Sequence, residues 1–147
     1  MKCENYVKLS FPALSRNESY ARAAVGAFVS QLDPTLDELG SVKAAVSEAV
    51  TNCVVHAYSE WETVGIINIT ARIKEEDVYI KITDKGCGIE DIKKAMEPLF
   101  TTKPELERSG LGFAVMESCC DKVKVSSKVG KGTTVTLTFR FDKKVLK

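Results

Sequence analysis

Two polar side chains in the first half of the chain have the types and spacing that phosphate chemistry uses. Glu48 and Asn52 lie four residues apart in a stretch with helical apolar spacing, so both fall on one helix face. A carboxylate can orient a hydroxyl or water and take its proton. An asparagine oxygen suits Mg²⁺, which needs few protein ligands because it keeps waters and phosphate oxygens. The pair predicts the reactive end of a phosphate site; an exposed polar pair on an amphipathic helix is the alternative.

A further carboxylate, Asp84, follows a segment in which apolar and polar residues alternate. The inward positions of that segment are Val78, Ile80 and Ile82. Asp84 continues their period of two, so its side chain should point toward the apolar layer. A buried charge needs a hydrogen-bonding partner, and the exocyclic amine of adenine is a neutral donor that suits it. Gly86 and Gly88 would let the backbone approach a flat ring. A loop aspartate that caps a hairpin is the alternative.

The last apolar segment places a threonine in the same kind of position. Thr133 is in phase with the inward residues Val135, Leu137, Phe139 and Phe141. If its strand runs antiparallel to the strand of Asp84, the start of one meets the end of the other. Thr133 and Asp84 would then share one pocket floor. The alternative is a threonine that merely begins a strand after Gly132.

A glycine pair begins a later helix. Gly110 and Gly112 flank Leu111, and backbone N–H groups at a helix start bind phosphate well. Lys103 and Arg108 precede this motif and are placed to close on phosphate charge. A simple turn and two solvated cations are the alternatives.

Composition limits the class of protein. The chain has 147 residues, 44% hydrophobic and 28% charged, with 21 lysines and arginines against 20 acids for a net charge of +1. One globular domain over residues 1–147 is expected. The balanced charge argues against a nucleic-acid or membrane-surface partner. No apolar run approaches a membrane span and no secretory signal begins the chain, so we expect a cytoplasmic protein with reduced thiols at its five cysteines.

The elements that must position these residues begin with a half-buried strand at Val7–Phe11. Ser15 and Glu18 form a capping-box pattern that predicts the start of a helix. Asp33 and Pro34 should end this helix, with the proline in the first turn of the next. That second helix is predicted from about residue 35 to 57, with its inward face starting at Leu36.

The second half of the chain changes to a strand rhythm. Alternating segments predict strands at 67–73 and 78–82, and the stretch 90–108 is irregular. A short helix at 113–120 and strands at 123–127 and 133–141 complete the order. Strands and helices do not alternate as in a doubly wound fold. The sequence therefore predicts an α+β fold, a two-layer sandwich with helices on one face of a mixed, mostly antiparallel sheet.

The order of the four motifs resembles a known superfamily. Residues 48–52, 84–88, 110–113 and 132–134 resemble the N, G1, G2 and G3 boxes of the Bergerat ATP-binding fold, shared by gyrase, Hsp90, histidine kinases and MutL. No Walker A motif or protein-kinase catalytic loop is present. Outside the boxes, residues 31–35, 98–104 and 107–109 look like those of the bacterial anti-sigma F factors, which are serine-protein kinases.

The resemblance implies a role for each box. Glu48 would be the general base and Asn52 the Mg²⁺ ligand. Residues that bind the ATP or ADP adenine would be Asp84, Gly86, Gly88, Ile89 and Thr133. A lid over the phosphates would run from Lys103 to Gly112, with Arg108, Ser109, Gly110 and Leu111 in it. The other nucleotide-binding residues would be Thr101, Thr102 and Phe113.

The resemblance also implies protein partners. The chain would bind a sigma factor of the sigma F type as a homodimer and phosphorylate a serine of an anti-anti-sigma factor. Glu18 and Arg22 match positions that the family uses for partner contact. Three alternatives stay open: a stress-response switch kinase for another sigma factor, a nucleotide-gated binding module without kinase turnover, and an ATPase.

Overall fold

The computed structural model describes residues 4–59, 61–97 and 112–141. The strands are β1 (Glu4–Pro12), β2 (Ile66–Lys74), β3 (Asp77–Asp84), β4 (Lys122–Lys128) and β5 (Gly132–Arg140). The helical elements are α1 (Asn17–Val29), the 3₁₀ turn η1 (Ser30–Leu32), α2 (Leu36–Asn52), the π-helical turn η2 (Cys53–Ala57), α3 (Ile92–Ala95) and α4 (Gly112–Cys119).

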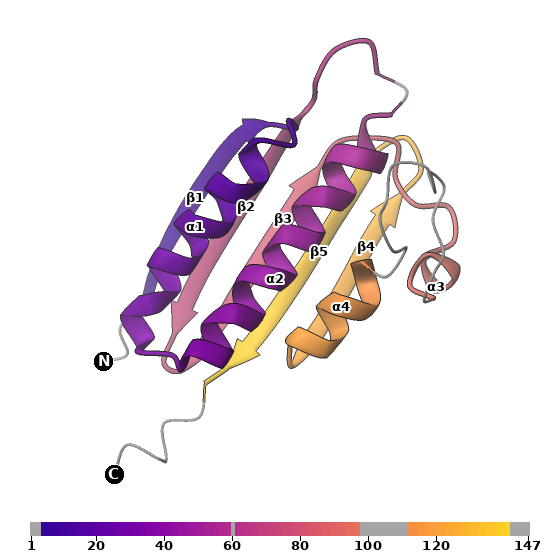
Figure 1. Cartoon of the computed structure of the whole chain (residues 1–147). Helices are drawn as coiled ribbons and strands as arrows, with labels where there is room; N and C mark the ends of the chain where they lie inside the picture. Colours follow the sequence, from indigo (N-terminus) through magenta and orange to yellow (C-terminus); the bar gives the residue numbers. More distant parts are fainter. Residues whose placement is uncertain (1–3, 60, 98–111, 142–147) are drawn as a thin grey trace.

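The five strands form one sheet in the order β1-β2-β3-β5-β4, and each neighbouring pair is antiparallel. Helices α1, α2 and α4 lie over one face of this sheet (Figure 1). The predicted two-layer α+β architecture is confirmed. Among the described helices, none combines the length and the apolar content that crossing a bilayer requires.

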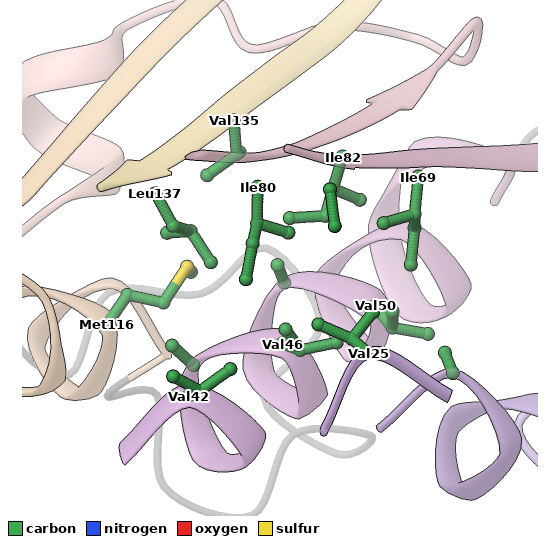
Figure 2. Packing of buried hydrophobic residues seen from close by; sticks show 14 of the residues in the cluster. Val25, Val42, Val46, Val50, Ile69, Ile80, Ile82, Met116, Val135 and Leu137 are labelled. Atoms are coloured by element: carbon green, nitrogen blue, oxygen red, sulfur yellow. The ribbon is translucent and has the colours of Figure 1, made fainter. Parts of the chain in front are cut away.

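The core lies between the helices and the sheet. Val46 and Val50 of α2 face Ile80 and Ile82 of β3, with Met116 of α4 beside them (Figure 2). All five side chains are buried. Burial of each such side chain stabilises the fold by about 1.5–3 kcal/mol, before the entropy cost of folding is counted. The alternating positions predicted for β3 and β5 are the buried ones, so both strands have the expected phase.

The expected capping box at the start of α1 is wrong. The helix begins after Arg16, whose backbone is already helical and whose side chain makes no cap hydrogen bond. Glu18 does not reach back toward Ser15, because its carboxylate instead accepts hydrogen bonds from Arg22 and Thr51. An interaction between helices therefore replaces the local cap.

A capping box is present at the start of α2. The Thr35 hydroxyl accepts from the Glu38 N–H at 3.0 Å, and the Glu38 carboxylate accepts from the Thr35 N–H at 2.8 Å. Pro34 consequently precedes the N-cap residue Thr35. The prediction that this proline lies in the first turn of the helix is therefore wrong. Leu36 is also not inward: it is 88% exposed. At 100° per residue it falls roughly a third of a turn from the centre of the buried stripe of this helix.

Two predicted segments contain finer structure. The helix expected to reach residue 57 is α-helical only to Asn52 and ends in the π-helical turn η2. Such turns are rare and often occur at functional sites. The stretch expected to be irregular contains the short helix α3, whose Lys94 N–H is capped by Asp91 at 3.1 Å.

Candidate functional site

Asp84 is a buried carboxylate at the end of β3. Its side chain is 6% exposed. Oδ1 accepts backbone hydrogen bonds from Gly86 at 3.0 Å and from Thr133 at 3.2 Å, and Oδ2 accepts from the Cys53 thiol at 3.5 Å. Loss of solvation raises the pKa of Asp84, and these three hydrogen bonds oppose the rise. A thiol is a weak donor, so Oδ2 keeps capacity for a stronger one.

Thr133 lies directly opposite Asp84 in the sheet, because β3 and β5 are antiparallel with these two residues in register. The prediction that they share one pocket floor is confirmed as geometry. The Thr133 hydroxyl lies 2.7 Å from the Ser127 hydroxyl of β4. Ser127 also accepts from the Ile89 N–H at 2.7 Å, so the β4–β5 hairpin holds the loop that follows Asp84.

Two glycines of that loop pack where a side chain has no room. A Cβ on Gly86 would overlap the carbonyl of Ala57 at the end of η2. Gly88 has a φ of +79°, and a Cβ there would overlap the carbonyl of Lys128 in the hairpin. The loop is therefore enclosed between the end of the long helix and the β4–β5 hairpin. The approach of these two glycines to a flat ring stays a prediction.

Glu48 and Asn52 converge on the start of α4. Both are half-buried on α2. A Cβ on Gly112 would lie 3.1 Å from Asn52 Oδ1 and 3.5 Å from Glu48 Oε2. The Asn52 amide nitrogen is buried without a hydrogen-bond partner among the described residues. A buried N–H₂ without a partner is costly in a folded protein, so the position suits a bound acceptor such as a phosphate oxygen.

Cys53 connects the two ends of the site. It follows Asn52 in the chain, and its thiol donates to Asp84. Burial, together with the nearby Asp84 charge, raises the pKa of Cys53 well above its usual range, so the thiol stays protonated and remains a donor. The acceptor on the sheet and the polar pair on α2 are therefore linked by the single residue that follows Asn52.

The two predicted partner-contact residues hold α1 against α2. Arg22 donates to Glu18 at 2.6 Å and to the Ser47 hydroxyl at 3.0 Å, and Thr51 donates to Glu18 at 3.0 Å. Arg22 and Glu18 are partly exposed. Ser47 and Thr51 each precede a predicted site residue of α2, so this network lies next to the polar pair.

The remaining predicted site residues have mixed outcomes. Gly112 is buried and Phe113 is half-buried against the core in the first turn of α4. Ile89 is half-buried in the loop after Asp84. Seven predicted nucleotide-binding residues lie outside the described residues: Thr101, Thr102, Lys103, Arg108, Ser109, Gly110 and Leu111.

Sequence reasoning did not single out Ser127, Cys53 or Tyr58. The alternation that identified Thr133 could also have identified Ser127, because Ser127 continues the inward positions of the two valines of β4. Cys53 was expected in the apolar stripe, but its contact with Asp84 depends on how the helix meets the sheet. Tyr58 contacts backbone groups distant in sequence, and no local pattern marks such contacts.

Residues 11–139 match the model of the histidine kinase-like ATPase domain family. The anti-sigma F factor of Clostridium beijerinckii is 51% identical over 139 residues, covering 95% of this chain and 96% of the relative. The chain belongs to the anti-sigma F factor family. The anti-sigma F factor of Anoxybacillus flavithermus is 55% identical and covers 90% of each chain. Membership in the histidine kinase-like ATPase domain family implies that the chain has a nucleotide site.

Two solved structures share the fold of this chain. The RsbU and RsbW domains of a Mycobacterium tuberculosis protein match with a TM-score of 0.66 at 19% identity, over 93% of this chain and 32% of that one. A histidine kinase domain from Erythrobacter litoralis matches with a TM-score of 0.57 at 17% identity, over 90% of this chain and 63% of that one. The chain thus spans less than two thirds of either protein.

Proposed function

We propose that this chain is an anti-sigma factor and a serine-protein kinase. It would hold a sigma factor of the sigma F type and use Mg-ATP to phosphorylate a serine of an anti-anti-sigma factor. The observation that carries the proposal is the convergence of Glu48 Oε2 and Asn52 Oδ1 at Gly112, with the residue after Asn52 hydrogen-bonded to Asp84. Names of relatives that are more than half identical support the sigma-factor role.

The adenine end of the site is assigned to Asp84. Its Oδ1 is already occupied by two backbone donors, whereas Oδ2 has only a thiol. The exocyclic amine of adenine is a stronger donor that fits Oδ2. Gly86 and Gly88 let the loop backbone lie directly against Ala57 and Lys128, which fixes the loop beside Asp84. Ile89 and Thr133 flank this position on the loop and on β5.

The Asn52 side chain fits a magnesium-bound phosphate. Its Oδ1 is a hard oxygen ligand, and its buried amide nitrogen has no partner among the described residues, so a phosphate oxygen can accept from it. When bound, Mg²⁺ neutralises charge on the phosphate oxygens. Gly112 leaves the space that this group needs, because a larger residue there would crowd both Asn52 and Glu48.

Glu48 is assigned as the general base. The serine oxygen of the partner forms the new bond to the γ-phosphorus, and the bond from that phosphorus to the β–γ bridging oxygen breaks. ADP leaves, and the proton of the serine hydroxyl passes to Glu48. A carboxylate in this role contributes about 10²–10⁴ in rate. Simple nucleotide binding does not require it.

The lid remains part of the proposal. It is assigned to Lys103 through Gly112, and Thr101, Thr102 and Phe113 at its two ends are assigned to nucleotide binding. Gly112 and Phe113 begin α4, and Gly112 lies next to Asn52 and Glu48. Lys103 and Arg108 would bring positive charge to the phosphates of ATP. Nucleotide state could then alter which partner fits the edge of the lid.

Partner contact is assigned to Glu18 and Arg22 on α1. Their network with Ser47 and Thr51 fixes both side chains in one orientation, which lowers the entropy cost of a further contact. A homodimer in the cytoplasm is proposed from the family resemblance alone. A phosphoserine on the antagonist would weaken a fit made for a hydroxyl, because it adds charge and bulk.

The test combines the purified chain, sigma F, an anti-anti-sigma factor and labelled Mg-ATP. We expect label on a serine of the anti-anti-sigma factor and a complex with sigma F on a sizing column. Nucleotide binding without label on any candidate would favour a gated binding module. Release of free labelled phosphate without a protein acceptor would favour an ATPase, and kinase activity with a different sigma factor would favour the stress-response type.

A further inference from the structure

Tyr58 lies just beyond the π-helical turn η2, and its ring is packed closely on both sides. The side chain is buried. A Cβ on Gly65 would overlap the Tyr58 ring, so the backbone before β2 lies directly against it. The ring of Trp61 meets Tyr58 edge-on, with centroids 4.6 Å apart and planes at 70°. The ring is therefore held in one place by its surroundings.

The Tyr58 hydroxyl connects two backbone groups that are distant in sequence. It accepts a hydrogen bond from the Lys85 N–H at 2.8 Å and donates one to the Ile66 carbonyl at 2.6 Å. Burial raises the pKa of Tyr58, so the hydroxyl keeps the proton that it donates. Because its single proton goes to Ile66, its acceptor side is directed at Lys85.

Lys85 stands between the two residues that define the adenine end of the site. Asp84 precedes it and Gly86 follows it. The next anchor of this loop is the Cys87 N–H, which donates to the Ala57 carbonyl at 2.7 Å. Two consecutive residues at the end of the helix, Ala57 and Tyr58, thus hold the loop from one side. Loss of the hydroxyl would leave the Lys85 N–H and the Ile66 carbonyl unpaired.

We propose that Tyr58 is a positioning residue for the nucleotide site, which holds the loop after β3 so that Asp84 and Gly86 stand ready for adenine. This inference rests on the proposed function. Tyr58 itself contacts no proposed ligand position, and it acts through Lys85. Its hydroxyl therefore contributes to nucleotide affinity and not to the transfer step at Glu48 and Asn52.

The test compares Tyr58→Phe with wild type and with Tyr79→Phe. Tyr79 is the matched control, because its hydroxyl makes a 3.3 Å hydrogen bond to Asp77 at the opposite end of β3. ADP affinity is measured by calorimetry below the melting temperature of every variant, and exchange of the Lys85 amide proton is followed by NMR. We expect Tyr58→Phe to bind ADP roughly tenfold more weakly, the size of one hydrogen bond. Its Lys85 amide should exchange faster, and Tyr79→Phe should match wild type.

The outcomes separate this inference from the proposed function. In the transfer assay, KM for ATP should rise in Tyr58→Phe with kcat unchanged, which a loss of folded protein would not produce. Equal ADP affinity of Tyr58→Phe and wild type would overturn the positioning role. Failure of wild type itself to bind ADP would overturn the proposed function first. If Tyr58→Phe does not fold, Gly65→Ala displaces the ring while keeping the hydroxyl, and it must also weaken ADP binding.

Discussion

The Asp84 carboxylate accepts a 3.2 Å hydrogen bond from the backbone N–H of Thr133, the residue directly opposite it in the sheet. The bond uses Oδ1, which also accepts from Gly86, and leaves Oδ2 with the weak thiol donor of Cys53. Selection for stability alone would not favour a buried carboxylate with one oxygen left to a weak donor, because burial of the charge is unfavourable. The unfavourable free energy of burying Asp84 is consistent with a carboxylate that is retained to bind a ligand.

Asp84→Asn should separate nucleotide binding from stability. The asparagine oxygen can take the place of Oδ1 and keep both backbone hydrogen bonds, so the fold is retained. Its amide nitrogen would replace Oδ2 and meet the adenine amine donor to donor. We expect ADP affinity to fall at least about 100-fold, with a melting temperature equal to or above that of wild type. ADP binding within a few-fold of wild type by calorimetry would remove Asp84 from the adenine site.

The raised pKa of Asp84 predicts a pH dependence. Its pKa is higher in the folded than in the unfolded chain, so its contribution to stability is fully present below the unfolded pKa. That contribution is lost as pH rises through the folded pKa. Nucleotide binding needs the ionised form and should show the opposite trend, weakening as pH falls through the raised pKa. Calorimetric titrations with ADP from neutral to mildly acidic pH check this, and a flat profile would count against it.

Gly112→Ala should damage the phosphate end of the site. The new Cβ would lie 3.1 Å from Asn52 Oδ1, close enough that the amide must shift. We expect ATP affinity to fall by roughly tenfold, since one organising polar contact is displaced. Gly40→Ala is the matched control within α2, because a Cβ there meets nothing within 4 Å. The control should bind ATP normally and gain about 0.5–1 kcal/mol of stability. Equal ATP affinity in both variants would contradict the assignment.

The starts of α1 and α2 should respond differently to loss of the hydroxyl in their capping patterns. Thr35→Ala removes a complete capping box and should lower the free energy of unfolding by about 1 kcal/mol. Ser15→Ala changes a side chain that does not cap α1, and its effect should stay within about 0.5 kcal/mol. Urea denaturation followed by circular dichroism measures both. A larger loss for Ser15→Ala would mean that α1 is capped differently in solution.

Much of the site was predictable because strand phase and helix phase are local properties. Period two placed Asp84 and Thr133 on the inward face, and their pairing followed once β3 and β5 were antiparallel. Spacing of four placed Glu48 and Asn52 on one face of α2. These inferences needed only the geometry of regular elements.

Other features depend on tertiary contacts and could not be read from local sequence. Glu18 matches a capping-box pattern, but a partner on another helix, Thr51, competes for its carboxylate. The hydroxyl of Tyr58 joins Ile66 to Lys85, and no periodic pattern relates these residues. Both features depend on hydrogen bonds between residues that only the tertiary fold brings together.

The most direct measurement is single-turnover transfer of labelled phosphate from ATP to the anti-anti-sigma serine, with wild type and Glu48→Gln compared at equal nucleotide occupancy. Calorimetry with ADP first establishes that both proteins bind nucleotide with similar affinity. We predict that Glu48→Gln transfers phosphate at least about 100-fold more slowly, because the base that takes the serine proton is absent. Transfer by Glu48→Gln at the wild-type rate would contradict the role of Glu48 as the general base.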